Sequence, residues 1–196
     1  MTVKWREIFT TEYDKEMDKI SQLFTPFQKL SSIGNSLDLL FQFEGDFILV
    51  GGIARRFYSS PRNTGDIDIL FRGEGELQEF LLKNKGKYKP LRKHAIMVSG
   101  VEVDLLTPEF LNINPPLVDY IFNNYEIYEN IKISPREGII LLKLMRMSPT
   151  DDNDIRALIE SGGKNLKVQD ILNLSGEGQR EVINSLLNQS KMFLEE

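Results

Sequence analysis

The sequence has 196 residues, of which 41% are hydrophobic and 27% are charged, a composition typical of one globular domain or of one domain with a small appended bundle. Its 29 acidic and 24 basic residues give a net charge of −5, which excludes a protein that coats nucleic acid through a positive overall field. The sequence has no cysteine and one histidine, which excludes disulfides and thiolate chemistry and disfavours histidine-based sites.

The N-terminal third is predicted to be helical, with apolar residues such as Leu37, Leu40 and Phe41 beside polar ones. Its first twenty residues contain no apolar run of the kind found in a signal peptide. The longest apolar stretches of the sequence are far shorter than the roughly 18 residues that a membrane span needs. We therefore expect a cytoplasmic protein without membrane contact.

A glycine pair follows the first predicted strand. Residues 47–50 form an apolar run, which is typical of a strand buried on both faces. Gly51 and Gly52 come next, and residues 53–59 are compatible with a short helix that Pro61 stops. A strand, two glycines and a helix start form a layout that can seat a phosphate group on backbone N–H groups.

Residues 66–71 alternate in polarity and predict a second strand. Side chains two apart share a face of a strand, so Asp66 and Asp68 lie together and opposite Ile67 and Ile69. An amphipathic helix around residues 77–81 follows and closes near Gly86.

A hairpin is predicted next, with residues 95–98 and 101–106 joined by Ser99 and Gly100. In its second arm, Glu102 and Asp104 share one face. Thr107 and Pro108 end this strand, and a proline-rich loop at residues 114–116 separates it from the C-terminal part of the chain.

From Pro135 onward the pattern is helical, with predicted helices around residues 139–146, 151–159, 168–174 and 177–194. We therefore predict an α/β (α+β) fold in which helices flank a mixed sheet. Residues 1–134 would form the α/β core with its N-terminal helices. Residues 135–196 would form a helical bundle packed on that core as one compact unit.

Three carboxylates converge if the strand at residues 66–71 pairs with the strand at 101–106. Asp66, Asp68 and Asp104 would then repel one another unless a cation lay among them, and hard oxygen ligands select Mg²⁺ or Mn²⁺. Glu102 is an alternative third ligand, and the acids could also simply face water.

Other candidate residues have simpler structural explanations. The glycine pair could be only a tight turn, and Lys143 could be a salt-bridged lysine on an apolar helix face. Helix capping would explain at least one of Asp151, Asp152 and Asp154, and His94 is expected at the surface. A basic run at residues 83–93 could guide an acidic acceptor such as RNA, although such runs are usually solvated.

The glycine pair, the string Arg62-x-Thr64-x-Asp66-x-Asp68 and the later Asp104 resemble the signature of the nucleotidyltransferase superfamily, which has the polymerase-β-like minimal fold. Within that superfamily the sequence is most similar to the abortive-infection AbiEii-like group. Lys143-Leu144, followed by Asp151-x-x-Asp154, resembles a later motif of the same group. Met145 and Thr150 depart from it, where the group usually has a small and a basic residue.

The resemblance implies a metal-dependent enzyme that moves a nucleotidyl group from NTP, such as ATP, to an acceptor hydroxyl and releases pyrophosphate. Asp66, Asp68 and Asp104 would be catalytic and would bind magnesium or manganese. The implied nucleotide-binding residues are Gly51, Gly52, Arg62, Thr64 and Lys143. The acceptor is left open between RNA, a protein and a small molecule.

Two other functions fit parts of the pattern. One is a nucleotide-binding or toxin–antitoxin-type interaction protein of the same fold, with an antitoxin-like partner and no turnover. The other is a glycosyltransferase that uses its Asp-x-Asp on a nucleotide sugar, although only about 65 residues precede that motif here.

Overall fold

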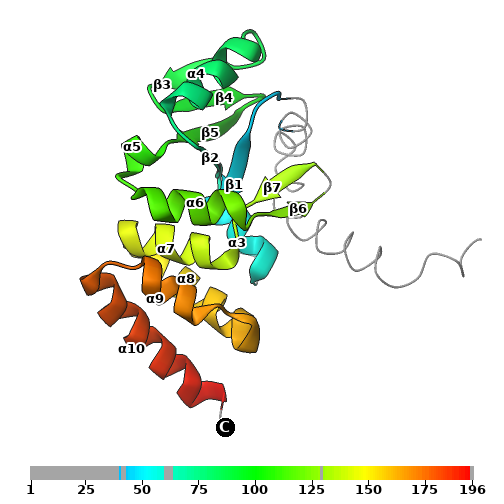
Figure 1. The fold of residues 1–196 in the computed structure, drawn as a ribbon. Helices are drawn as coiled ribbons and strands as arrows, with labels where there is room; N and C mark the ends of the chain where they lie inside the picture. The colour runs from blue at the N-terminus through cyan, green and yellow to red at the C-terminus, as the bar shows by residue number, and fades with distance from the viewer. Residues whose placement is uncertain (1–39, 41–42, 60–63, 129, 195–196) are drawn as a thin grey trace, which may run out of the picture.

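A computed structural model describes residues 40, 43–59, 64–128 and 130–194 of the chain. Over these residues the fold is mixed α/β, with one sheet of seven strands in the order β3-β4-β5-β2-β1-β7-β6 and helices around it (Figure 1). The strands are β1 (Phe47–Val50), β2 (Asp66–Phe71), β3 (Lys89–Arg92), β4 (Ala95–Val98), β5 (Val101–Leu106), β6 (Glu126–Tyr128) and β7 (Ile131–Ile133).

Helices follow and separate these strands, and the C-terminal part of the chain is helical (Figure 1). No helix among the described residues combines the length and the apolar character needed to cross a membrane. The helices are α3 (Gly51–Tyr58), α4 (Glu74–Lys83), α5 (Pro108–Leu111), α6 (Pro115–Asn123), α7 (Arg136–Arg146), α8 (Asp151–Gly162), α9 (Val168–Leu174) and α10 (Glu177–Leu194), with a 3-10 turn at Gly163–Asn165.

The centre of the sheet is a mixed arrangement of β1, β2 and β5. β1 runs antiparallel to β2, whereas β2 runs parallel to β5. Ile67, Ile69 and Phe71 of β2 are completely buried, as expected for an apolar set on one face of a strand. The alternate residues Asp66 and Asp68 are only partly buried, so this central strand carries two acids beside the hydrophobic core.

Different helices cover the two faces of these central strands. On one face, Phe80 of α4 packs against Phe71 and Phe47, with ring centroids 5.0 and 5.7 Å away. On the other face, α3 contacts β2 and α7, and buried side chains such as Ile139 extend the core into α7. The two acids of β2 therefore lie between the sheet and the start of α3.

Most of the predicted elements are confirmed. The two central strands and the 95–106 hairpin have the predicted bounds, and the four C-terminal helices are present. The short helix starts at Gly51, two residues before the predicted start. The N-terminal helices lie outside the described residues, apart from Leu40. The boundary near residue 134 falls between β7 and α7, and the division into two domains remains a prediction.

Several elements were not predicted, among them the edge strand β3, the β6–β7 hairpin and the helices α5 and α6. The prediction of a surface position for His94 is also wrong. Its side chain is only 8% exposed because the turn between β3 and β4 folds it against Phe110 of α5, where the two rings stack 4.1 Å apart.

Candidate functional site

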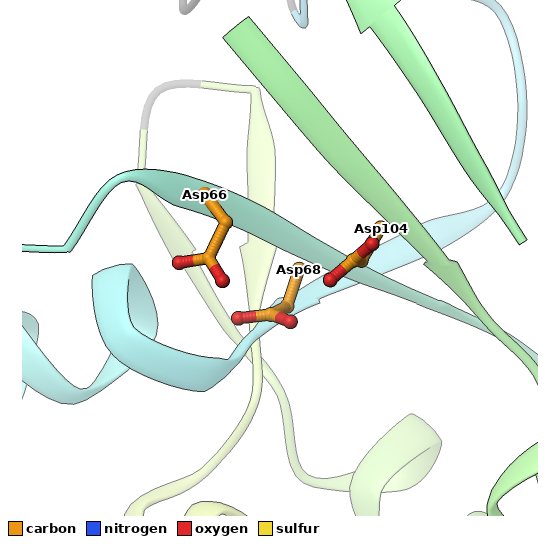
Figure 2. A group of neighbouring side chains, drawn as sticks. All are labelled: Asp66, Asp68 and Asp104. Carbon is orange, nitrogen blue, oxygen red and sulfur yellow. The ribbon is translucent and has the colours of Figure 1, made fainter. Parts of the chain in front are cut away.

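Three carboxylates converge at the centre of the sheet. Asp66 and Asp68 project from the same face of β2, and the parallel register sets Asp68 opposite Asp104 of β5. One oxygen of each carboxylate lies within 4.8 Å of the others, and Figure 2 shows the three side chains gathered over the two strands. The structure therefore brings together the acids that the strand pairing predicts, while their catalytic role remains a prediction.

Glu102, the alternative third ligand, has another partner. It lies opposite Asp66 in the register, but its carboxylate forms an ion pair with Arg92 of β3. Arg92 also contacts Asp104, with its Nη2 2.7 Å from Oδ1 of that residue. The carboxylate group that could hold a metal within the described residues includes Asp104 and not Glu102.

The glycine pair allows α3 to begin directly against these acids. Gly51 has a φ of +67°, and a Cβ at this position would lie 1.8 Å from Oδ2 of Asp68. A Cβ on Gly52 would lie 2.7 Å from Oγ1 of Thr64, and the N–H of Gly52 donates a hydrogen bond to Asp68. The start of α3 lies so close to β2 that only glycine fits at both positions. A tight turn alone therefore does not explain why residues 51 and 52 are glycines.

The electrostatics of the site favour a bound cation. Burial, together with the charges of Asp66 and Asp104, raises the pKa of Asp68 to about 6. Burial also raises the pKa of Asp104, although the neighbouring Arg92 opposes that shift. Thr64 donates a 2.6 Å hydrogen bond to Asp66. The negative charges of these carboxylates are therefore close together and only partly neutralised. A bound divalent cation would reduce the repulsion between them.

A polar cavity of about 380 Å³ opens beside the carboxylates. Gly52, Thr64, Ser148 and Thr150 line its walls, together with Arg146. Hydroxyls, backbone N–H groups and a guanidinium are donors that suit phosphate oxygens. The cavity could therefore hold a polyphosphate next to a metal at the three acids.

Lys143 lies in a buried ion-pair network. Its Nζ is 3.0 Å from Asp151 and 2.6 Å from Asp154, and its side chain is 4% exposed. Arg146 and Arg55 complete the network through Asp151 and Asp154, respectively. This geometry matches the salt-bridged interpretation of Lys143, and its role in nucleotide binding remains a prediction.

The acids at the start of α8 bind side chains and do not cap the helix. Asp151 and Asp154 belong to the buried network, whereas Asp152 pairs with Arg156 one turn later. No side chain caps the first turn, and Asp151 accepts instead from the N–H of Ser148, before the helix. No capping hydrogen bond is therefore observed, although all three acids lie in the first turn of α8, where the helix dipole favours negative charge.

Sequence reasoning missed Arg146, Ser148 and Thr150, which line the polar cavity. A basic residue in the last turn of α7, followed by two hydroxyl residues before α8, was the available signal. Thr64, Gly51 and Gly52 all lie next to the acids of β2, and their role in nucleotide binding remains a prediction. Arg62, the remaining predicted phosphate ligand, lies outside the described residues.

Comparison with known proteins gives matches to solved structures alone. No model of a protein family and no curated protein matches the sequence. The crystal structure of ANT(2″)-Ia in complex with adenylyl-2″-tobramycin is similar at 15% identity and a TM-score of 0.44, over 87% of this chain and 98% of that one. The solution structure of the antibiotic-resistance factor ANT(2″)-Ia is similar at 15% identity and a TM-score of 0.40, over 94% and 99% of the two chains. Scores this low assign neither a family nor an activity, so a function for this chain has to rest on its own geometry.

Proposed function

We propose that this protein is a metal-dependent nucleotidyltransferase that moves an NMP group from NTP to an acceptor hydroxyl and releases pyrophosphate. The observation that carries this proposal is the convergence of Asp66, Asp68 and Asp104 against the glycine pair that begins α3. A cluster of acidic side chains by itself is compatible with many roles. Here the cluster lies against the glycine pair that begins α3 and beside a polar cavity, and this combination can bind a metal–polyphosphate complex.

The residues present fit a hard divalent cation. All three donors are carboxylate oxygens, which favour Mg²⁺ or Mn²⁺ over softer metals. They come from two paired strands of the central sheet, so their spacing is held by the fold. When bound, the metal neutralises phosphate charge and lowers the pKa of a hydroxyl that coordinates it.

The chain itself would bind and orient the substrate. Asp66 and Asp68 would hold the cation that carries the phosphates, and Asp104 would extend the carboxylate set toward the acceptor. Gly52, Thr64 and Arg146 would seat the β- and γ-phosphates in the polar cavity.

The transfer is a single displacement at phosphorus. The acceptor oxygen forms a bond to the α-phosphorus as the bond to the bridging oxygen breaks, and pyrophosphate leaves with that electron pair. The hydroxyl proton passes to a carboxylate of the site or to water. Arg62 and Lys143, which the resemblance also implies, would add positive charge near the triphosphate.

Calorimetric titration with Mg²⁺ and each of the four NTPs tests the binding part of this proposal. We expect the wild type to bind, and the double variant Asp66→Asn, Asp68→Asn to lose metal-dependent binding while it keeps its fold. Asp46→Asn is the matched control, because this exposed acid pairs with Lys132 away from the site. Unchanged binding in the double variant would refute the assignment.

Release of labelled pyrophosphate in the presence of RNA, protein or small-molecule acceptors tests the transfer part. Release that depends on an acceptor supports the transferase, and binding without release with every acceptor supports the non-catalytic alternative. Hydrolysis of a nucleotide sugar, without turnover of NTP, would favour the glycosyltransferase.

A further inference from the structure

An apolar cavity of about 290 Å³ lies next to Asp68, and neither metal binding nor phosphate binding accounts for it. Its walls come from the end of β5, from α5 and from one side of α7. Leu106, Phe110, Leu111, Leu142 and Met145 are among its lining residues. Its volume is close to the lower limit of about 300 Å³ for small-molecule sites, so it suits one part of a ligand.

Phe110 lines this cavity and packs against the ring of His94. His94 stacks on one face of its ring, with centroids 4.1 Å apart and an interplanar angle of 20°. The Phe110 side chain is nevertheless 53% exposed, which is unusual for a residue that lines an apolar cavity. An aromatic ring that is stacked by one neighbour and still half-exposed has ring surface left for stacking against a flat ligand.

The apolar cavity and the polar cavity meet at the same two charged residues. Asp68 and Arg146 line both of them. One ligand that passed over Asp68 could therefore place a polyanion among the donors of the polar cavity and an uncharged ring among the apolar side chains. A nucleoside triphosphate has these two parts at its two ends.

We propose that the apolar cavity binds the nucleobase of the NTP, stacked on Phe110. This inference rests on the proposed function, since it assigns the second half of the same substrate. Asp66 lines the polar cavity and Asp104 lines neither cavity, which leaves the Asp104 side of the carboxylate group for the acceptor. The cavity is thus placed for the donor nucleotide.

The lining also determines how the base is recognised. Apart from Asp68, Lys143 and Arg146, every lining side chain is apolar or glycine. Lys143 is already engaged by Asp151 and Asp154. Side chains of the cavity therefore provide stacking and apolar contact for the base, without hydrogen bonds to its edge. We expect purine NTPs to bind somewhat more tightly than pyrimidine NTPs, because they bury more ring surface.

The test compares NTP with inorganic tripolyphosphate, which lacks a base, by calorimetry in the presence of Mg²⁺. We expect Phe110→Ala to bind NTP about 5- to 150-fold more weakly than the wild type, the range for loss of one base–aromatic stack. Its affinity for tripolyphosphate should stay unchanged. Phe110→Tyr should restore the affinity for NTP. Ile127→Ala removes an exposed apolar side chain of β6 and is the control.

Two results would overturn this inference. One is an unchanged affinity of Phe110→Ala for NTP, which would place the base elsewhere. The other is an equal loss of affinity for NTP and tripolyphosphate, which would show that Phe110 acts on the phosphate end. A wild type that binds neither compound would instead contradict the proposed function itself, so the two failures are distinguishable.

Discussion

At Gly51, backbone conformation and close packing impose the same requirement. Its φ of +67° lies in a region that L-residues rarely adopt, and its missing Cβ leaves the space that Oδ2 of Asp68 occupies. Gly75, in the first turn of α4, differs in both respects, since a Cβ there would meet nothing within 4 Å. The two glycines therefore form a matched pair for substitution.

Gly51→Ala should weaken the binding of Mg²⁺ with NTP by 10-fold or more, because the new methyl group must displace the Asp68 carboxylate. It should also lower the free energy of unfolding by roughly 2 kcal/mol from backbone strain and overpacking. Calorimetry and urea unfolding measure the two effects. Gly75→Ala should leave binding intact and stabilise α4 by up to about 1 kcal/mol. Normal binding by Gly51→Ala would show that the close approach is not needed.

At the level of single residues, positions were predictable where the chemistry of the local sequence alone determines the geometry. Asp66 and Asp68 must share a face because side chains of a strand alternate, and the glycine pair marks a close approach because only glycine lacks a Cβ. The burial of His94 could not be predicted, since it depends on Phe110, which is sixteen residues away in the sequence and belongs to a different element.

At the scale of elements, buried ion pairs tie α7 and α8 to α3. Lys143 of α7 contacts Asp151 and Asp154 of α8, and Arg55 of α3 contacts Asp154 with its Nε 3.1 Å from Oδ1. Asp151 is fully buried and Asp154 is 1% exposed. Burial opposes the ionisation of Asp151, but hydrogen bonds from Arg146, Ser148 and Lys143 outweigh it and hold its pKa well below the usual range.

Lys143→Met should therefore lower the free energy of unfolding by about 2 to 4 kcal/mol, because it leaves two buried carboxylates short of a partner. Urea unfolding without nucleotide measures this effect apart from any role in binding. Lys132→Ala, which breaks a partly exposed pair with Asp46, is the matched control and should cost less than about 1 kcal/mol. Similar stability of Lys143→Met and the wild type would contradict a structural role for the network.

Elements with strong local signals were predictable, and elements defined by their neighbours were not. The apolar run of β1 and the helical spacing of α7 are visible in the sequence. By contrast, β3 has the sequence Lys-Pro-Leu-Arg and all four residues are exposed, so its strand conformation depends on pairing with β4. The three-residue strands β6 and β7 likewise depend on pairing, with each other and, for β7, with β1. In α6, Pro115 and Pro116 suggested a loop, but proline is favoured in the first turn of a helix, and Asn114 caps it.

At the scale of the whole molecule, the carboxylate group makes stability depend on pH. The pKa of Asp68 is about 6 in the folded chain, against a usual value of 3.8. Between these values the folded state binds more protons than the unfolded state, so the free energy of unfolding falls as pH rises through this window. The folded, metal-free protein therefore carries a destabilising charge at neutral pH, and a bound cation would remove that cost.

Metal-free protein in EDTA should lose on the order of 1 to 3 kcal/mol of stability between pH 4 and pH 7 through Asp68, as its pKa shift requires. Because other groups titrate over the same range, the measured quantity is the difference between the wild type and Asp68→Asn in urea unfolding at each pH. This variant should be the more stable of the two at pH 7 in EDTA, and their difference should shrink toward pH 4.

Saturating Mg²⁺ should reverse the order of stability at pH 7, because it binds the folded wild type. At a concentration 100-fold above its dissociation constant, the bound metal adds about 2.7 kcal/mol to the free energy of unfolding. Equal pH profiles of the two proteins in EDTA would show that the acids do not strain the fold, and a wild type insensitive to Mg²⁺ and Mn²⁺ would remove the reason for a metal at this site.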